Sequence, residues 1–192
     1  YYLLYAFKYV YSSDREHGKT AAANLAKNAQ NLNVKVRASM LLANVFGIER
    51  DWSSSLRHLS DGLALLPRIS DSDIIQNILT VAAISYLELE EYQLALRYSE
   101  QLLGMELPAR TMCVARQVNS EAALHSNIID INDAQLHQAI EFCENENEYL
   151  WAGVLHVSIA NARLKVGEAR AVTEYLLPHL KKIENTKYPR LI

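Results

Sequence analysis

The chain has 192 residues, half of them apolar, and a formal net charge of -3. This length suits one domain or one short repeat array, and the apolar fraction is enough to build a core. The Lys and Arg residues are scattered beside acids, which argues against nucleic acid as a partner. No apolar run approaches the roughly 20 residues that span a bilayer, so we expect no membrane-embedded segment here. Since the chain opens inside an apolar pattern without a Met, we interpret it as an excised fragment of a longer protein.

Apolar residues recur with helical spacing along the whole chain, and no segment alternates with a period of two over a useful length. Good helix formers dominate the composition, and Gly and Pro fall mostly at the joints between periodic segments. Pro178 is expected to kink or restart the last segment. The predicted helices are 2–11, 14–30, 34–48, 51–66, 73–88, 91–106, 109–125, 133–145, 147–166 and 168–185.

Polar residues at several predicted helix starts can accept hydrogen bonds from the first free N–H groups. Asp51 is expected to cap the helix that begins after it. Asn132 with Gln135 resembles a capping box, and Ser70 and Ser72 offer caps for the helix near 73.

Two stretches of the chain superpose at a shift of 40 residues. Small residues at equivalent places, such as Ala43 with Ala83, would let two helices approach closely, and an acid-aromatic step such as Asp51-Trp52 marks the turn into each second helix. The first set is Leu42, Ala43, Phe46, Asp51, Trp52, Ser55, Leu59, Gly62 and Pro67, and the second is Leu79, Ala82, Ala83, Tyr86, Glu91, Tyr92, Ala95, Ser99 and Leu102.

This pattern resembles the tetratricopeptide repeat, and the best matches lie over 36–69 and 76–108. It departs from the family in having Ser39 where Trp is preferred and in having Pro108 one place later than expected. The resemblance implies an all-α fold: a right-handed α-solenoid of about five antiparallel helix pairs, forming a single repeat domain over 1–192.

A narrower resemblance concerns the segment 41–52, with the sequence LLANVFGIERDW, and the segment 91–98. Both look like bacterial signalling proteins in which periplasmic tetratricopeptide-like repeats precede a membrane helix and a GGDEF diguanylate cyclase domain. The cyclase motif is absent from this chain. The resemblance therefore implies that the chain is a periplasmic sensory part of an inner-membrane-anchored parent, with the enzyme downstream.

The tetratricopeptide resemblance also implies a concave binding groove lined by the first helix of each pair. The lining is mixed and lacks a Lys/Arg cluster for a terminal carboxylate, so it suits a peptide segment or another helix, although an unknown small ligand is also open. The alternative is that its apolar members are simply packed within the array. The groove positions are Arg37, Met40, Asn44, Ile48, Asn77, Thr80, Ile84 and Leu87.

The sequence offers little sign of catalysis, so we expect no enzyme, no cofactor and no metal site. It holds no His-Glu-x-x-His motif, Gly-rich phosphate loop or nucleophile elbow. His137 and Glu141 sit four residues apart and could share a helix face, but two ligands are too few for a metal site. The clustered acids are interpreted as solvated, and the histidines as lying on helix surfaces: His17, His58, His125, His137, His156 and His179.

Cys113 and Cys143 lie at similar distances on either side of the 126–132 turn. In an antiparallel hairpin they would sit at similar height, where a disulfide forms if the Cα atoms come within about 7 Å. Such a bond would agree with an oxidising compartment, and two buried free thiols are the alternative.

Tyr2, Tyr5 and Tyr9 share one face of the first predicted helix. This face either packs in the core or is exposed as a surface for a homodimer.

Two functions remain open from the sequence. One is a sensor region that controls a downstream cyclase, and the other is a cytoplasmic scaffold that holds a partner peptide in its groove.

Overall fold

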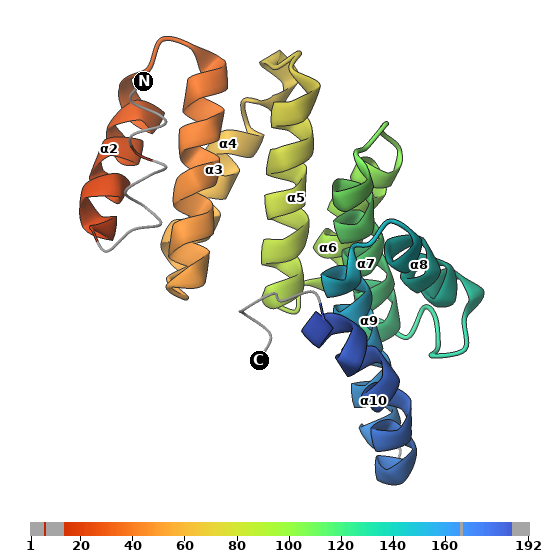
Figure 1. Ribbon diagram of the computed structural model, residues 1–192. Coiled ribbons are helices and arrows are strands. Elements are labelled where there is room, and N and C mark those ends of the chain that lie inside the picture. Colours follow the sequence, from red (N-terminus) through yellow and green to blue (C-terminus); the bar gives the residue numbers. More distant parts are fainter. Residues whose placement is uncertain (1–5, 7–13, 166, 186–192) are drawn as a thin grey trace. The chain divides into compact units, whose positions relative to one another are not determined.

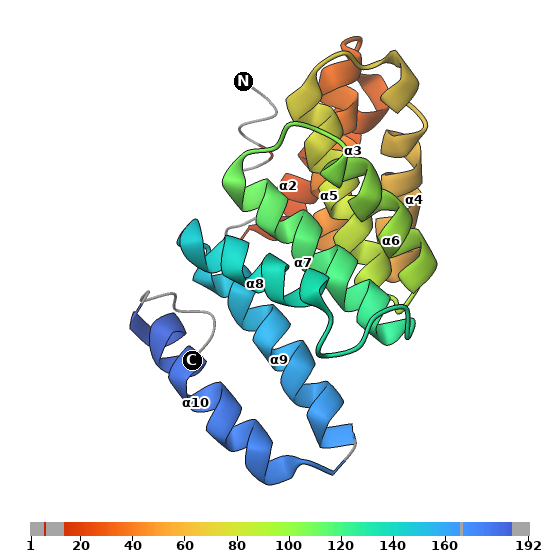
Figure 2. The same cartoon turned by 90° about the vertical axis from the view of Figure 1, so that its right-hand side faces the viewer.

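A computed structural model describes residue 6, residues 14–165 and residues 167–185, with side chains as far as residue 181. Within these residues the fold is all-α, and no strand occurs. The helices are α2 (Arg15–Asn28), α3 (Leu32–Ile48), α4 (Trp52–Leu63), α5 (Ser72–Glu88), α6 (Tyr92–Leu103), α7 (Ala109–His125), α8 (Ala134–Asn145), α9 (Tyr149–Lys165) and α10 (Ala169–Asn185), with a short 3-10 turn at Leu66–Arg68 (Figures 1 and 2).

The predicted all-α class is confirmed, and most predicted bounds lie close to the observed ones. Two predicted helices are too long. The helix expected over 51–66 ends at Leu63 and gives way to the 3-10 turn around Pro67, because proline cannot continue the hydrogen-bond ladder. The helix expected over 91–106 ends at Leu103, where Gly104 forms the C-cap. Apart from residue 6, the predicted helix over 2–11, with its tyrosine face, lies outside the described residues.

The chain divides into two compact units, residues 1–85 and residues 86–192. In the first unit, α3 packs against both α2 and α4, and α2 runs beside α3 in Figure 1. In the second unit each helix from α6 to α10 packs against the next, and α7 also contacts α9. Figure 2 shows α9 and α10 lying side by side. The single repeat domain expected over 1–192 stays a prediction.

The first unit is built around the nonpolar face of α3. Leu41, Leu42 and Val45 are almost completely buried and form a cluster with Ala22 of α2. On α3, Ala43 has no exposed surface, and its carbonyl accepts a hydrogen bond of 2.8 Å from the buried Ser55 hydroxyl of α4. A small side chain and a short polar one therefore stand where the two helices meet.

Ala83, the counterpart of Ala43 in the predicted repeat, also has no exposed surface. Ala95, the counterpart of Ser55, is likewise fully buried. The small residues that carry the predicted repeat are therefore all in tightly packed places.

The helix ends repeat as well, through the same turn without glycine. Arg50 and Glu90 are 40 residues apart in the sequence and both have φ of 60°. Beside them, the N–H of Asp51 donates to the carbonyl of Phe46, and the N–H of Glu91 to that of Tyr86, each at 2.9 Å. This six-residue closure with a left-handed residue is the Schellman motif. Among the described residues it recurs at Asn127 and Asn147, and with glycine at Gly167.

Aspartates cap more helices than the sequence patterns predicted. The predicted cap of α4 is confirmed, because Asp51 accepts from the Ser54 N–H at 3.1 Å. The capping box at Asn132 is wrong: Asp133 is the N-cap of α8 and accepts from the backbone N–H of Gln135. The Gln135 side chain instead donates to buried Asn119.

The cap predicted before α5 is wrong in the same way. There the Asp71 carboxylate accepts from the Ile74 N–H at 3.2 Å, in the place predicted for a serine hydroxyl of Ser70 or Ser72.

Enlarging either buried alanine should destabilise the chain. Ala43→Leu and Ala83→Leu each force extra methyl groups into filled space, and each should lower the free energy of unfolding by about 1–3 kcal/mol. Urea unfolding followed by circular dichroism measures this. Ala23→Leu, at an exposed position of α2, is the matched control and should change stability by less than about 0.5 kcal/mol. Equal effects at all three sites would contradict the packing described above.

Relieving the left-handed residue at the α3–α4 turn should stabilise the chain. Arg50→Gly removes the clash of Cβ at φ 60°, and the gain is offset in part by the greater freedom of glycine in the unfolded chain. The free energy of unfolding should rise by about 0.5–1 kcal/mol in the same urea experiment. Arg57→Gly, inside α4, should lower it by about 1 kcal/mol. If Arg50→Gly and Arg57→Gly both lower the free energy of unfolding, the Arg50 side chain makes a contact that stabilises the chain more than its left-handed backbone destabilises it.

Candidate functional site

The residues predicted to line a groove all keep some exposed surface. Among the described side chains, Ile48 is the most exposed large hydrophobic residue, with 64% of its surface accessible. Arg37 forms an ion pair with Asp71 at 3.8 Å, and the Thr80 hydroxyl donates to the Gln76 carbonyl at 2.7 Å. Asn77 is exposed, and the others are partly buried: Met40, Asn44, Ile84 and Leu87.

The two cysteines meet in the second unit as a disulfide between α7 and α8. Their Cα atoms lie 5.5 Å apart, within the range a disulfide can bridge. Both residues are fully buried in a nonpolar cluster that also holds Leu136 and Leu155. The covalent link therefore runs through the core formed by α7, α8 and α9.

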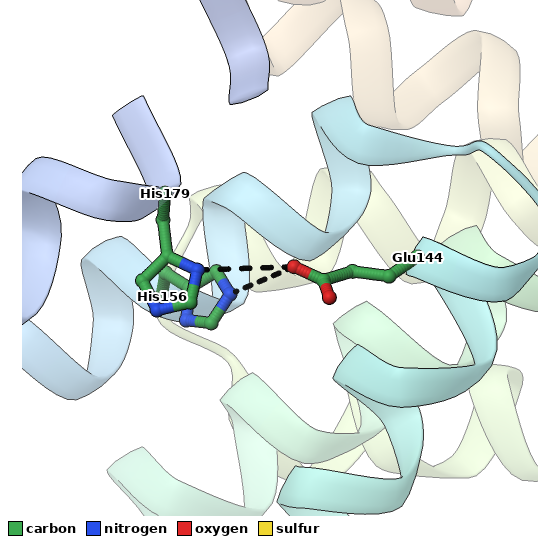
Figure 3. Close-up of side chains that lie close together, drawn as sticks. All are labelled: Glu144, His156 and His179. Carbon is green, nitrogen blue, oxygen red and sulfur yellow. Dashed lines mark ion pairs between the residues drawn. The ribbon is translucent and has the colours of Figure 1, made fainter. Parts of the chain in front are cut away.

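Three side chains with metal-ligating atoms converge from three helices of the second unit. Glu144 lies at the end of α8, His156 in the middle of α9 and His179 in α10. The Glu144 Oε1 atom is 3.6 Å from His156 Nε2 and 3.8 Å from His179 Nδ1. Figure 3 shows both imidazole rings facing the one carboxylate. The three ligand atoms lie within 4.8 Å of one another.

The two imidazole rings stack on each other. Their centroids are 3.5 Å apart and their planes differ by 25°. His156 is 5% exposed, whereas the side chains of Glu144 and His179 keep about a quarter of their surface accessible. The cluster is therefore closed at His156 and open to solvent beside the other two residues.

The burial of His156 corrects the prediction that all the histidines lie on helix surfaces. α9 packs against α7, α8 and α10, so most of its circumference faces other helices. His17, His125 and His137 are exposed as predicted, and His58 and His179 are partly buried.

A tyrosine of α10 fixes the other nitrogen of the buried histidine. The Nδ1 atom of His156 lies 2.7 Å from the Tyr175 hydroxyl. Burial raises the pKa of Tyr175, and the nearby Glu144 carboxylate adds to the rise while Arg163 opposes it. The Tyr175 hydroxyl can accept a hydrogen bond from Nδ1–H of His156, or donate one to an unprotonated Nδ1. In the first arrangement the Nε2 lone pair faces Glu144.

The position of Glu144 depends on the turn around it. Its neighbour Cys143 is tied to α7 by the disulfide. The Cys143 carbonyl accepts from the Glu148 N–H at 2.8 Å, which closes the turn that contains Asn147 in the left-handed region. This turn reverses the chain, and α9 then packs against α8 and places His156 beside Glu144.

Sequence reasoning missed this cluster because it searched for ligands spaced along one helix. The three residues come from three helices, at separations of 12 and 23 residues. The one local signal was a histidine in each of two consecutive predicted helices, which many surface helices also have.

A separate pocket of about 360 Å³ lies in the second unit, between the end of α7, the loop after it and α9. Its walls combine apolar residues such as Leu124 and Ile131 with Asn161, Asp130 and Lys165. No local sequence pattern predicts this pocket, because its walls come from segments far apart in the chain.

Comparisons with protein-family models, with curated proteins and with solved structures find no match to this chain. Among the described residues, no helix combines the length and the apolar character that crossing a bilayer requires.

Removing the disulfide should destabilise the second unit. The cysteines are 30 residues apart, and opening a loop of that length should cost about 3–4 kcal/mol of unfolding free energy. The variant with Cys113→Ala and Cys143→Ala, compared with the parent in urea, measures the loss.

Dithiothreitol supplies the control for this comparison. It should lower the stability of the parent toward that of the double variant and leave the double variant unchanged. A parent whose unfolding is insensitive to the reductant would contradict a disulfide in the folded chain.

Proposed function

We propose that this chain is a ligand- or protein-binding sensory module of a bacterial signalling protein, built as a right-handed tetratricopeptide-like solenoid of about five helix pairs. It would regulate a diguanylate cyclase domain encoded outside this chain. The observation that carries the proposal is the repetition of packing and turns at a shift of 40 residues, at Ala43 and Ala83 and again at Arg50 and Glu90. Stacked repeats of this kind commonly present an extended binding surface.

The expected groove positions support a binding role because they keep accessible surface. On α3, residues Arg37, Met40, Asn44 and Ile48 recur at steps of three or four and so share one helix face. An exposed Ile48 beside an amide offers nonpolar contact together with hydrogen bonding, which a peptide segment or an amphipathic helix can use.

The disulfide supports a periplasmic place for the module. Disulfides persist in oxidising compartments and are rare in the reducing cytoplasm, and Cys113–Cys143 lies in the core of the second unit. A periplasmic sensor would have to transmit its state across the inner membrane to the cyclase. A ligand does this by binding one of two conformations more tightly than the other.

The second candidate is a cytoplasmic scaffold that holds a partner peptide in the same groove. The exposed Ile48 favours it equally, since a hydrophobic anchor with amides nearby needs no signalling domain. The two candidates differ in compartment and in the domains attached to the module in the parent protein.

The full-length parent gene tests the proposal. We expect it to encode a membrane helix and a GGDEF domain after this module, and a phosphatase fused to the module should be active in the periplasm. A parent with no such helix and domain, or a fusion active only in the cytoplasm, would reject the sensor in favour of the scaffold.

A groove variant tests the binding surface in the full-length parent. Ile48→Asp places a charge on the exposed nonpolar position and should abolish any change in cyclic-di-GMP synthesis that extracts of the growth medium produce. Ile128→Asp is the matched control, since Ile128 is 61% exposed and lies outside the expected groove; it should respond like the parent. An unchanged response in Ile48→Asp would remove this face from the binding surface.

A further inference from the structure

We propose that Glu144, His156 and His179 bind one divalent transition-metal ion, for which Zn²⁺ is the best fit. Two imidazoles and one carboxylate are ligands that zinc accepts, with a fourth position left for water or another donor. The proposal rests on the geometry of the second unit and is independent of the sensory role.

Two of the distances between the donor atoms are close to those expected around a bound ion. Around a tetrahedral zinc with bonds of about 2.0–2.2 Å, neighbouring donors lie about 3.3–3.5 Å apart. The Glu144 Oε1 atom lies 3.6 Å from His156 Nε2 and 3.8 Å from His179 Nδ1. These separations exceed a normal N···O hydrogen bond and approach the edge of such a tetrahedron.

The partner of the buried histidine also fits a ligand. Histidines that bind metal usually donate their other ring N–H to an oxygen, which fixes the tautomer and the ring orientation. Tyr175 stands in that place at 2.7 Å from Nδ1 of His156. The Tyr175 oxygen can accept a hydrogen bond from Nδ1–H, and in that tautomer the Nε2 lone pair is directed toward Glu144, where the ion would lie.

The exposed side of the cluster gives the metal ion a way in and leaves the His179 ring room to move. The ring planes now differ by only 25°, and both lone pairs reach a common point only if the rings splay further. His179 can make this movement, because 24% of its side chain is accessible, while buried His156 stays fixed.

The preference for a borderline metal comes from the donors. Imidazole nitrogen suits zinc, copper and nickel, whereas calcium and magnesium require several oxygen ligands. The fourth position would take water, since Glu144 and His179 both keep contact with solvent. Bound metal would join α8, α9 and α10.

Isothermal titration of the untagged, oxidised chain with ZnCl₂, after removal of metal by a chelator, tests the proposal. We expect one Zn²⁺ per chain, a rise in the melting temperature with zinc, and no saturable binding of Mg²⁺. Replacing zinc by Co²⁺ should give the visible absorption of a four-coordinate ion.

Variants locate the ion. His179→Gln and Glu144→Gln each remove one ligand, and each should weaken zinc binding more than about 100-fold, beyond the cost of losing a supporting hydrogen bond. Tyr175→Phe removes only that support and should weaken binding about 10–100-fold. His137→Gln, at an exposed position of α8, is the matched control and should bind as the parent does.

Circular dichroism and the melting temperature without metal show whether each variant folds. If His179→Gln does not fold, Glu144→Gln carries the test, since its side chain is partly exposed and similar in size. Absence of zinc binding by the parent, or equal affinity in the parent, His179→Gln and Glu144→Gln, would overturn the site.

Discussion

Each helix pair in this chain has a nonpolar face that only a neighbouring helix can cover, and small side chains set how closely that neighbour approaches. Ala43 and Ala83 have no exposed surface, and the Ser55 hydroxyl reaches the Ala43 carbonyl across the contact between α3 and α4. Burying side chains such as Leu41 and Leu42 contributes about 1.5–3 kcal/mol each. This gain requires the two helices to pack closely. The small residues at the contact therefore determine how fully the large side chains are buried.

The turns between helices show how a sequence can repeat a backbone without repeating a residue type. Glycine is the usual left-handed residue after a helix and takes this place at Gly167, but four other turns use Arg50, Glu90, Asn127 and Asn147. The hydrogen bonds that close each turn hold these residues in place. The positions of glycines therefore could not predict the left-handed residue at these four turns. The acid-aromatic step at Asp51-Trp52 nevertheless located the turn between α3 and α4.

The sequence predicted what depends on local pattern and missed what depends on tertiary contacts. Apolar spacing placed the helices, and the similar distances of Cys113 and Cys143 from one turn suggested a pairing that needs only a hairpin. The identity of a cap was harder, because Asn132 and Asp133 are chemically alike and differ by one residue in register. His156 could not be recognised as buried, because its burial depends on α7, α8 and α10 packing around α9.

The second unit is held at its two ends by different means. α7 and α8 are joined by the disulfide within a nonpolar cluster, whereas α10 has no such link; it contacts α9, and its Tyr175 packs against the cluster. Val172 is the buried hydrophobic residue among the described side chains of α10, while Leu177 and Leu180 are largely exposed. Tyr175 and His179 of α10 contact His156 through a hydrogen bond and through their rings. The contacts of α10 with α9 are therefore partly polar and aromatic, whereas α7, α8 and α9 share a nonpolar cluster.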